Sequence, residues 1–230
     1  CEDIKAGAAA GVKVTYFAGD AGDEETVKKM VEYTVSPEGL GGVDILVNSQ
    51  GYNKKMWSWE IDTKVWNGML NTNITSLMFT CKYFGNWMKE HNTEDGVVAD
   101  PSTFEAGKAT PCAGYGKIIN IGSMNSFFGG TTVPAYSAAK GAVTQLSKSI
   151  ASDCADHSIC CNVIAPGYMD TEMCANMSQE RKDECTKRIA AGRWGRPEDL
   201  KGPILFLASS ASDYLNGAVI PVDGGFLVKS

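Results

Sequence analysis

The sequence lacks the features by which metal sites, membrane spans and nucleic-acid surfaces are usually recognised. It has two histidines and eight cysteines but no C-x-x-C pair, so no ligand set has zinc-like spacing. The net charge is −6 and no Lys/Arg cluster interrupts it, which argues against a nucleic-acid surface. The longest apolar runs, such as 204–208, are far too short to cross a bilayer, and we expect no secretion signal. The sequence therefore predicts a protein that binds neither nucleic acid nor membrane.

The cysteines are expected to be reduced. Several lie inside apolar strand or helix patterns, where a thiol behaves as a small hydrophobic group. Cysteines that form no disulfide framework are typical of an intracellular protein, so we expect a cytoplasmic location.

The residues that are present indicate one α/β domain. The chain has 230 residues, of which 43% are hydrophobic and 21% charged, enough to bury a sizeable core. Strand-like stretches alternate with helical patterns: strands at 12–17, 43–47, 117–121, 159–164 and 218–222, and helices at 24–34, 66–89, 135–154 and 197–209. This alternation predicts a doubly wound, Rossmann-like parallel sheet between two layers of helices.

Two segments break the alternation. Residues 91–116 are polar and aperiodic, and at about 25 residues they far exceed the usual connection between a helix and a strand. We interpret them as a surface insertion, with a substrate lid or a subunit contact as the alternatives. Residues 168–193 form a second excursion, with a helical middle.

The stretch from Ser123 to Lys140 carries the most specific chemistry. Ser123 follows a buried strand, and thirteen residues later Tyr136-x-x-x-Lys140 opens a helix. Residues four apart lie on one helix face, and an ammonium beside a phenol lowers the pKa of the phenol from its ordinary value of about 10. Tyr136 could then donate and accept a proton near neutral pH. Because this spacing is common by itself, its meaning depends on the residues around it.

Other polar and turn residues stand where predicted strands end. In parallel sheets, ligands bind outside the carboxyl ends of the strands, so these residues should line one cleft. They are Asp20, Asn48 to Gly51, Ser123, and 166–167 with Thr171.

Each of these residues also has a plain structural explanation. Ser123 could be a strand-end turn residue, and Asp20 could cap the helix that follows it. Gly51 could be needed for a positive φ, which is compatible with close approach of a ligand. Asn73, within a helix, could face solvent or bind a neighbouring carbonyl.

In their order along the chain, these motifs resemble the short-chain dehydrogenase/reductase family, and the resemblance covers nearly the whole sequence. The motifs are Asn48-x-x-Gly51, Asn73, Ser123, Tyr136-x-x-x-Lys140, Pro166-Gly167 and Asp223-Gly224-Gly225. Residues 165–169, 192–200 and 205–214 further resemble the branch of 2-dehydro-3-deoxy-D-gluconate 5-dehydrogenases and gluconate 5-dehydrogenases.

The resemblance implies catalytic roles. Tyr136 would be the general acid in ketone reduction and the base in alcohol oxidation, and Lys140 would lower its pKa and bind the nicotinamide ribose. Ser123 would hold the substrate oxygen where negative charge develops. Asn73 would support a water that relays protons through Lys140.

The resemblance also implies NAD or NADP as the cofactor. The cofactor would supply the hydride, and the protein would supply the position and the electrostatics. Asp20, Asn48 and Gly51 would contact the adenosine part, and the Met169 backbone and Thr171 hydroxyl would hold the carboxamide. The choice between NAD and NADP is open, because the residues that normally set it are absent. Family members are mostly tetramers or dimers, so we expect a homo-oligomer.

The implied activity is interconversion of a secondary alcohol and a ketone on a small-molecule substrate, a sugar acid or polyol. A 3-oxoacyl thioester or a hydroxysteroid is the alternative substrate class. A non-catalytic binding protein is the third interpretation, because one expected motif is missing.

That motif is the glycine-rich loop whose amides hold the cofactor phosphates. No G-x-x-x-G-x-G or G-x-G-x-x-G sequence occurs in the chain. The strand expected at 12–17 resembles the third strand of the family, so we expect the first βαβ unit to be missing here and present in the natural protein. Without it, 12–17 would lose its neighbour and 43–47 would expose an apolar edge. A smaller departure is Gln50, where the family usually has alanine; its side chain could crowd the adenosine pocket or add a hydrogen bond.

Overall fold

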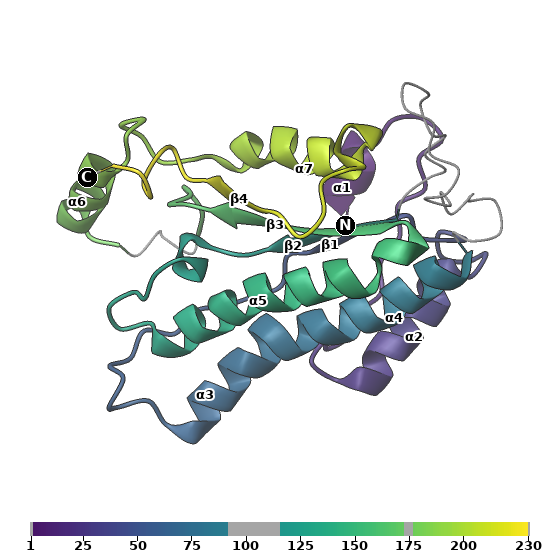
Figure 1. Ribbon diagram of the computed structural model, residues 1–230, viewed down its shortest axis with the longest axis horizontal. Helices are drawn as coiled ribbons and strands as arrows, with labels where there is room; N and C mark the ends of the chain where they lie inside the picture. The colour runs from purple at the N-terminus through teal and green to yellow at the C-terminus, as the bar shows by residue number, and fades with distance from the viewer. Residues whose placement is uncertain (1, 92–115, 173–176, 230) are drawn as a thin grey trace.

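A computed structural model describes residues 2–91, 116–172 and 177–229. Its middle layer is a parallel sheet of four strands in the order β1-β2-β3-β4 (Figure 1). The strands are β1 (Ile45–Asn48), β2 (Gly116–Ile121), β3 (Ile159–Pro166) and β4 (Val219–Val222). Since all four run in one direction, their carboxyl ends lie along one edge of the sheet.

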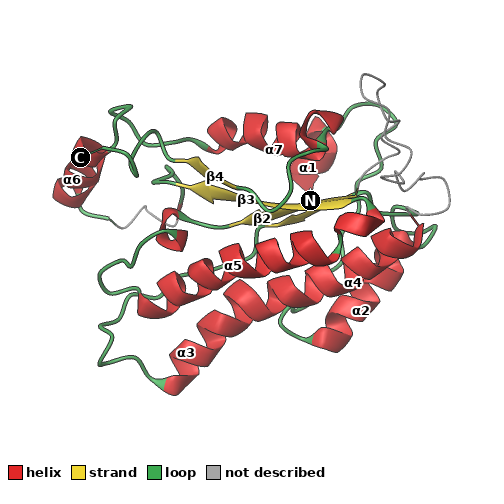
Figure 2. Ribbon diagram, in the orientation of Figure 1, coloured by secondary structure: helices red, strands yellow, loops and turns green. Residues whose placement is uncertain are grey.

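Helices cover the two faces of this sheet (Figure 2). The helices are α1 (Glu2–Gly7), α2 (Glu24–Val35), α3 (Thr63–Leu70), α4 (Ser76–His91), α5 (Pro134–Asp153), α6 (Gln179–Arg188) and α7 (Lys201–Ala208). Helices α4 and α5 pack on one face and α7 on the other. The doubly wound, Rossmann-like arrangement expected from the sequence is therefore confirmed.

The two hydrophobic cores follow from the alternation of side chains along β2. Ile118 packs with Leu77 of α4 and Val143 of α5, while Ile119 packs with Leu207 of α7. Successive residues of a strand point to opposite faces, so a strand covered on both sides carries apolar residues on both faces. This is why the largely apolar stretch at 117–121 predicted a buried parallel strand correctly.

The long helix expected at 66–89 is interrupted. It consists of α3, a π-helical turn at Asn71–Thr75 and α4. A π-turn inserts one extra residue per turn and frequently occurs at functional sites. Here it contains Asn73.

The prediction of a strand at 12–17 is wrong. These residues are extended but pair with no strand in the described part of the chain. They lie instead against α2, where the Thr15 and Tyr33 hydroxyls hydrogen-bond and the Phe17 ring lies 5.8 Å from that of Tyr33. A strand needs the amides and carbonyls of a neighbour.

The free edge of β1 shows the same shortage of partners. Ile45 and Val47 are 45% and 42% exposed, although they belong to a strand of buried type. The apolar edge expected from the sequence is thus present, and such an edge is a template for pairing with another strand. The expected first βαβ unit of the natural protein stays a prediction.

The described cysteines are thiols in the interior or close to it. Cys81 and Cys161 are buried, and burial raises the pKa of both thiols, that of Cys81 to about 12. They therefore stay protonated at neutral pH and pack as small apolar groups.

Within the described ranges, no helix is long and apolar enough to cross a membrane, and no cluster of side chains could hold a metal ion. Most of the segment expected to be an insertion, 92–115, lies outside the described residues.

Candidate active site

Ser123 stands at the carboxyl end of β2, in extended backbone, and caps a short 3-10 turn at Met124–Ser126. Its hydroxyl oxygen accepts the N–H of Asn125 at 3.2 Å, and the residue is 8% exposed. The serine is therefore a strand-end turn residue, which is the structural explanation considered for it in the sequence. The same turn fixes the position of its hydroxyl.

Ser126, which the sequence reasoning missed, ties this turn to the helix that carries Tyr136 and Lys140. Its hydroxyl accepts the N–H of Ser123 at 3.3 Å and donates to the carbonyl of Lys140 at 2.7 Å. One side chain thus fixes the Ser123 turn against α5. A serine three residues after a capping serine was the available signal, since such pairs form reciprocal caps.

Lys140 lies one turn after Tyr136 on α5, and it is 4% exposed. Its ammonium donates to the carbonyl of Ile121 at 2.8 Å and lies 5.8 Å from the centroid of the Tyr136 ring. Burial lowers the pKa of Lys140 from 10.5 to about 8, because desolvation disfavours the charged form. At pH 7 the side chain is still mostly protonated, so Tyr136 has a cation beside it.

Asn73 lies in the π-turn with no exposed surface. Its amide nitrogen donates to the carbonyls of Met69 and Tyr52, at 2.9 and 3.0 Å. Its amide oxygen is buried and has no hydrogen-bond partner among the described residues. Because buried acceptors are normally hydrogen-bonded, we expect this oxygen to accept a hydrogen bond from a ligand or a water molecule.

Gly51 brings the loop after β1 against Asn73 and Lys140. A Cβ atom on this glycine would lie 2.7 Å from Asn73 Oδ1 and 3.5 Å from Lys140 Nζ. Only a glycine allows so close an approach, so the loop, the π-turn and α5 meet at one point. Three residues that the sequence assigned to one site are brought together here.

The loop around Gly51 also contains unpaired polar atoms. Gln50 Nε2 and Asn53 Oδ1, on either side of Gly51, are buried without a partner in the described chain, like Asn73 Oδ1. Buried polar groups are nearly always hydrogen-bonded in folded proteins. These atoms are therefore free to bind a polar ligand.

Asn48 points the other way, into the core. Its amide nitrogen donates to Asn120 Oδ1 at 2.8 Å, and its oxygen accepts the Thr80 hydroxyl at 2.7 Å. The residue is buried, and Asn120 in turn donates to the Ser147 hydroxyl at 2.9 Å. The polar atoms of Asn48 are thus used in joining β1, β2, α4 and α5.

The Asn48 network makes a prediction about stability. Replacing Asn48 with alanine leaves Asn120 Oδ1 buried without its strong donor, and we expect unfolding to become easier by about 2–3 kcal/mol. Urea denaturation followed by circular dichroism measures this loss. Asn67→Ala, at an exposed position of α3, is the control and should change stability by less than about 0.5 kcal/mol. A loss as small as that of the control would show that the network contributes little.

The remaining predicted site residues lie outside the helices and the four strands of the sheet. Asp20 is exposed; its carboxylate accepts the N–H of Gly22 at 2.8 Å, whereas Asp23 is the residue that caps α2. Met169 forms a parallel bridge with Gly195 that uses the N–H of Asp170 and the carbonyl of Tyr168, so its own N–H is not spent in the bridge. Thr171 is exposed.

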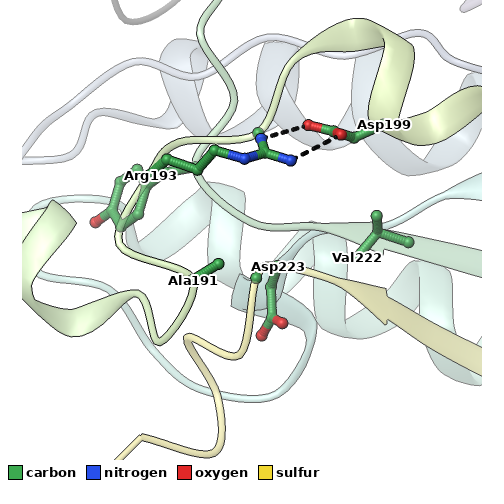
Figure 3. Close-up of a pocket in the computed structure, with 8 residues that line it drawn as sticks. Ala191, Arg193, Asp199, Val222 and Asp223 are labelled. Atoms are coloured by element: carbon green, nitrogen blue, oxygen red, sulfur yellow. Dashed lines mark hydrogen bonds and ion pairs between the residues drawn. The ribbon is translucent and has the colours of Figure 1, made fainter.

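A pocket of about 270 Å³ lies at the carboxyl ends of β3 and β4 (Figure 3). Its cation, Arg193, makes two hydrogen bonds to Asp199, at 2.8 and 3.0 Å, drawn as dashed lines in Figure 3. Since this guanidinium is already paired with a carboxylate, the pocket has little attraction for an anionic ligand. We place the candidate active site at Ser123, Tyr136 and Lys140 instead.

Comparison with known proteins decides the family. The family model described as short chain dehydrogenase matches residues 2–182. The chain belongs to this family. It is therefore an oxidoreductase, and its Ser123, Tyr136 and Lys140 stand in the geometry described above.

Named relatives of this short-chain dehydrogenase act on sugar acids. A 2-dehydro-3-deoxy-D-gluconate 5-dehydrogenase from Dickeya dadantii is 38% identical over 99% of the chain and 82% of its own length. A gluconate 5-dehydrogenase from Gluconobacter oxydans is 33% identical over 96% of the chain and 78% of its own length. A solved gluconate 5-dehydrogenase from Burkholderia cenocepacia, in complex with NADP and tartrate, matches with a TM-score of 0.78 at 29% identity, over 91% of this chain and 73% of that one.

Proposed function

We propose that this short-chain dehydrogenase interconverts a secondary alcohol and a ketone on a sugar acid of the gluconate type, with NAD or NADP as cofactor. The observation that carries the proposal is the meeting of the Ser123 turn, Tyr136 and buried Lys140 beside the unpaired amide oxygen of Asn73. The similarity to two gluconate-type dehydrogenases supports the substrate class.

The residues fit the nicotinamide end of such a cofactor. The unpaired Asn73 oxygen, the close approach at Gly51 and the Lys140 ammonium suit the hydroxyl groups of a ribose and an ordered water. Met169 and Thr171 would hold the carboxamide, and Asp20 the adenine end. The 230 residues contain no glycine-rich loop for the phosphates.

The chain's own residues would move the proton. In ketone reduction, the Tyr136 hydroxyl gives its proton to the substrate oxygen, and in alcohol oxidation the phenolate takes one. Lys140 stabilises the phenolate by its charge, and the Ser123 hydroxyl donates to the oxygen on which negative charge develops. Asn73 would orient the water that resupplies protons through Lys140. A bound cofactor would supply the hydride chemistry at the substrate carbon.

A turnover screen of the natural protein tests this function. We expect reduction of 5-keto-D-gluconate with NADPH or NADH, and little or no reduction of a 3-oxoacyl thioester or a ketosteroid. A preference for either of the latter would replace the sugar acid by the alternative substrate class. A non-catalytic protein of this family, the third interpretation, would turn over none of the three substrates. Calorimetry with NADPH would then show whether such a protein still binds the cofactor. The cytoplasmic location and the homo-oligomeric state stay predictions.

A further inference from the structure

Three arginines lie in or just after α6, and they differ in their partners. Arg181 pairs with Glu184 at 2.7 Å, and Arg193 pairs with Asp199. For Arg188, the described residues provide no carboxylate. Its guanidinium lies instead over the ring of Phe226, 4.3 Å from the centroid.

The Phe226 ring under Arg188 belongs to a group of apolar side chains next to Ser123. The Phe226 and Phe128 rings lie 6.1 Å apart at an interplanar angle of 27°, and Phe128 follows the turn that Ser123 caps. Met124, next to Ser123, and Ile189, next to Arg188, share one buried cluster with Phe226. Arg188, itself exposed, therefore lies over a ring whose buried cluster also contains the neighbour of Ser123.

The last turn of α6 is basic, whereas the acidic residues Glu180, Asp183 and Glu184 lie earlier in the helix. Lys187 precedes Arg188, and the Lys229 ammonium donates to the Lys187 carbonyl, which brings a further cation to this end of α6. Positive groups gathered beside a site attract anionic ligands and raise their local concentration. This corner differs in that respect from the pocket of Figure 3, where the cation is neutralised.

We infer that Arg188 binds the carboxylate of the substrate, an assignment that rests on the proposed function. A guanidinium stacked on an aromatic face keeps its N–H edge available, and that edge matches a carboxylate with two parallel hydrogen bonds. In a 5-keto sugar acid, the carboxylate is four carbon–carbon bonds from the ketone. When the ketone oxygen is held at Ser123 and Tyr136, the acid end of the substrate binds Arg188. Arg188 thereby determines specificity for acids over neutral sugars.

The test compares Arg188→Met, Arg188→Lys and the matched control Arg181→Met in the natural protein. Methionine keeps the apolar contact with Phe226 and removes the charge. For Arg188→Met we expect the KM for 5-keto-D-gluconate and the Kd for D-gluconate to rise about tenfold or more, with kcat little changed. The KM for D-fructose, a neutral ketose, should stay the same. Arg188→Lys should recover part of the affinity, and Arg181→Met should behave as the wild type.

Two results overturn the inference. One is a change of less than about twofold in both KM and Kd for Arg188→Met; the other is an equal rise for the acid and the neutral sugar, which would indicate a structural role. Binding of gluconate keeps this test separate from the proposed function. Wild-type protein that binds gluconate through Arg188 without turnover would contradict the function alone, and wild-type protein that does not bind gluconate would contradict the inference.

Discussion

Tyr136→Phe is expected to lower kcat for the sugar acid by about three orders of magnitude, since general acid–base groups of this kind contribute factors of 10² to 10⁴. The change removes one oxygen atom and leaves the ring in place beside Lys140. Cofactor affinity should therefore change little, and the loss should appear in kcat rather than in binding. Steady-state kinetics together with calorimetry of NADPH binding measure the two effects separately.

Tyr214→Phe is the matched control for this change. Tyr214 is fully exposed, and the loss of its hydroxyl should leave kcat unaltered. If Tyr136→Phe retained more than about a tenth of the wild-type kcat, another group would have to supply the proton, and the role given to Tyr136 would be wrong.

Lys140→Met is expected to change activity and stability in opposite directions. Turnover should fall by about two orders of magnitude, because Tyr136 loses the cation beside it. Unfolding at pH 7, without cofactor, should require up to about 2 kcal/mol more, since a buried charge is removed. Loss of the hydrogen bond to the Ile121 carbonyl offsets part of that gain.

The pH dependence of stability has a definite sign. The pKa of Lys140 is about 8 in the folded protein and near 10.5 when unfolded, so the unfolded chain binds more protons between these values. The contribution of Lys140 therefore makes the wild type more stable as pH rises from 8 to 10.5. Lys140→Met should lack this rise, whereas Lys148→Met, at an exposed position of the same helix, should keep it. Denaturant unfolding at pH 7, 8.5 and 10 measures the difference, and equal curves for wild type and Lys140→Met would contradict the assignment.

Local spacing was sufficient to predict that the Ser123 turn lies against the helix carrying Tyr136 and Lys140, and the catalytic role of these residues stays a prediction. Ser123, Tyr136 and Lys140 lie on one strand end and the helix that follows it, so their proximity depends mainly on the geometry of that unit. Gly51 could be placed in the cleft from its position after a strand, whereas Asn73 could be assigned only through the family resemblance, and the structure brings both to Lys140. The unpaired oxygen of Asn73 could not be read from sequence, because it depends on which carbonyls the π-turn presents.

Tertiary contacts explain what the sequence did not predict. The direction of Asn48 depends on Thr80 and Asn120, which come from distant parts of the chain. The stretch 12–17 has strand-like composition, yet composition does not supply a neighbouring strand, and these residues pack on α2 instead. The role of Arg188 depends on a ring near the end of the chain, Phe226, lying under a guanidinium at the end of α6.

The most direct measurement is a crystal structure of the natural protein with oxidised cofactor and D-gluconate bound. The account predicts that the C5 hydroxyl oxygen lies within hydrogen-bonding distance of both Ser123 Oγ and Tyr136 Oη, with the nicotinamide ribose at Lys140. Gluconate bound in the pocket lined by Arg193 and Asp199, away from Tyr136, would contradict it.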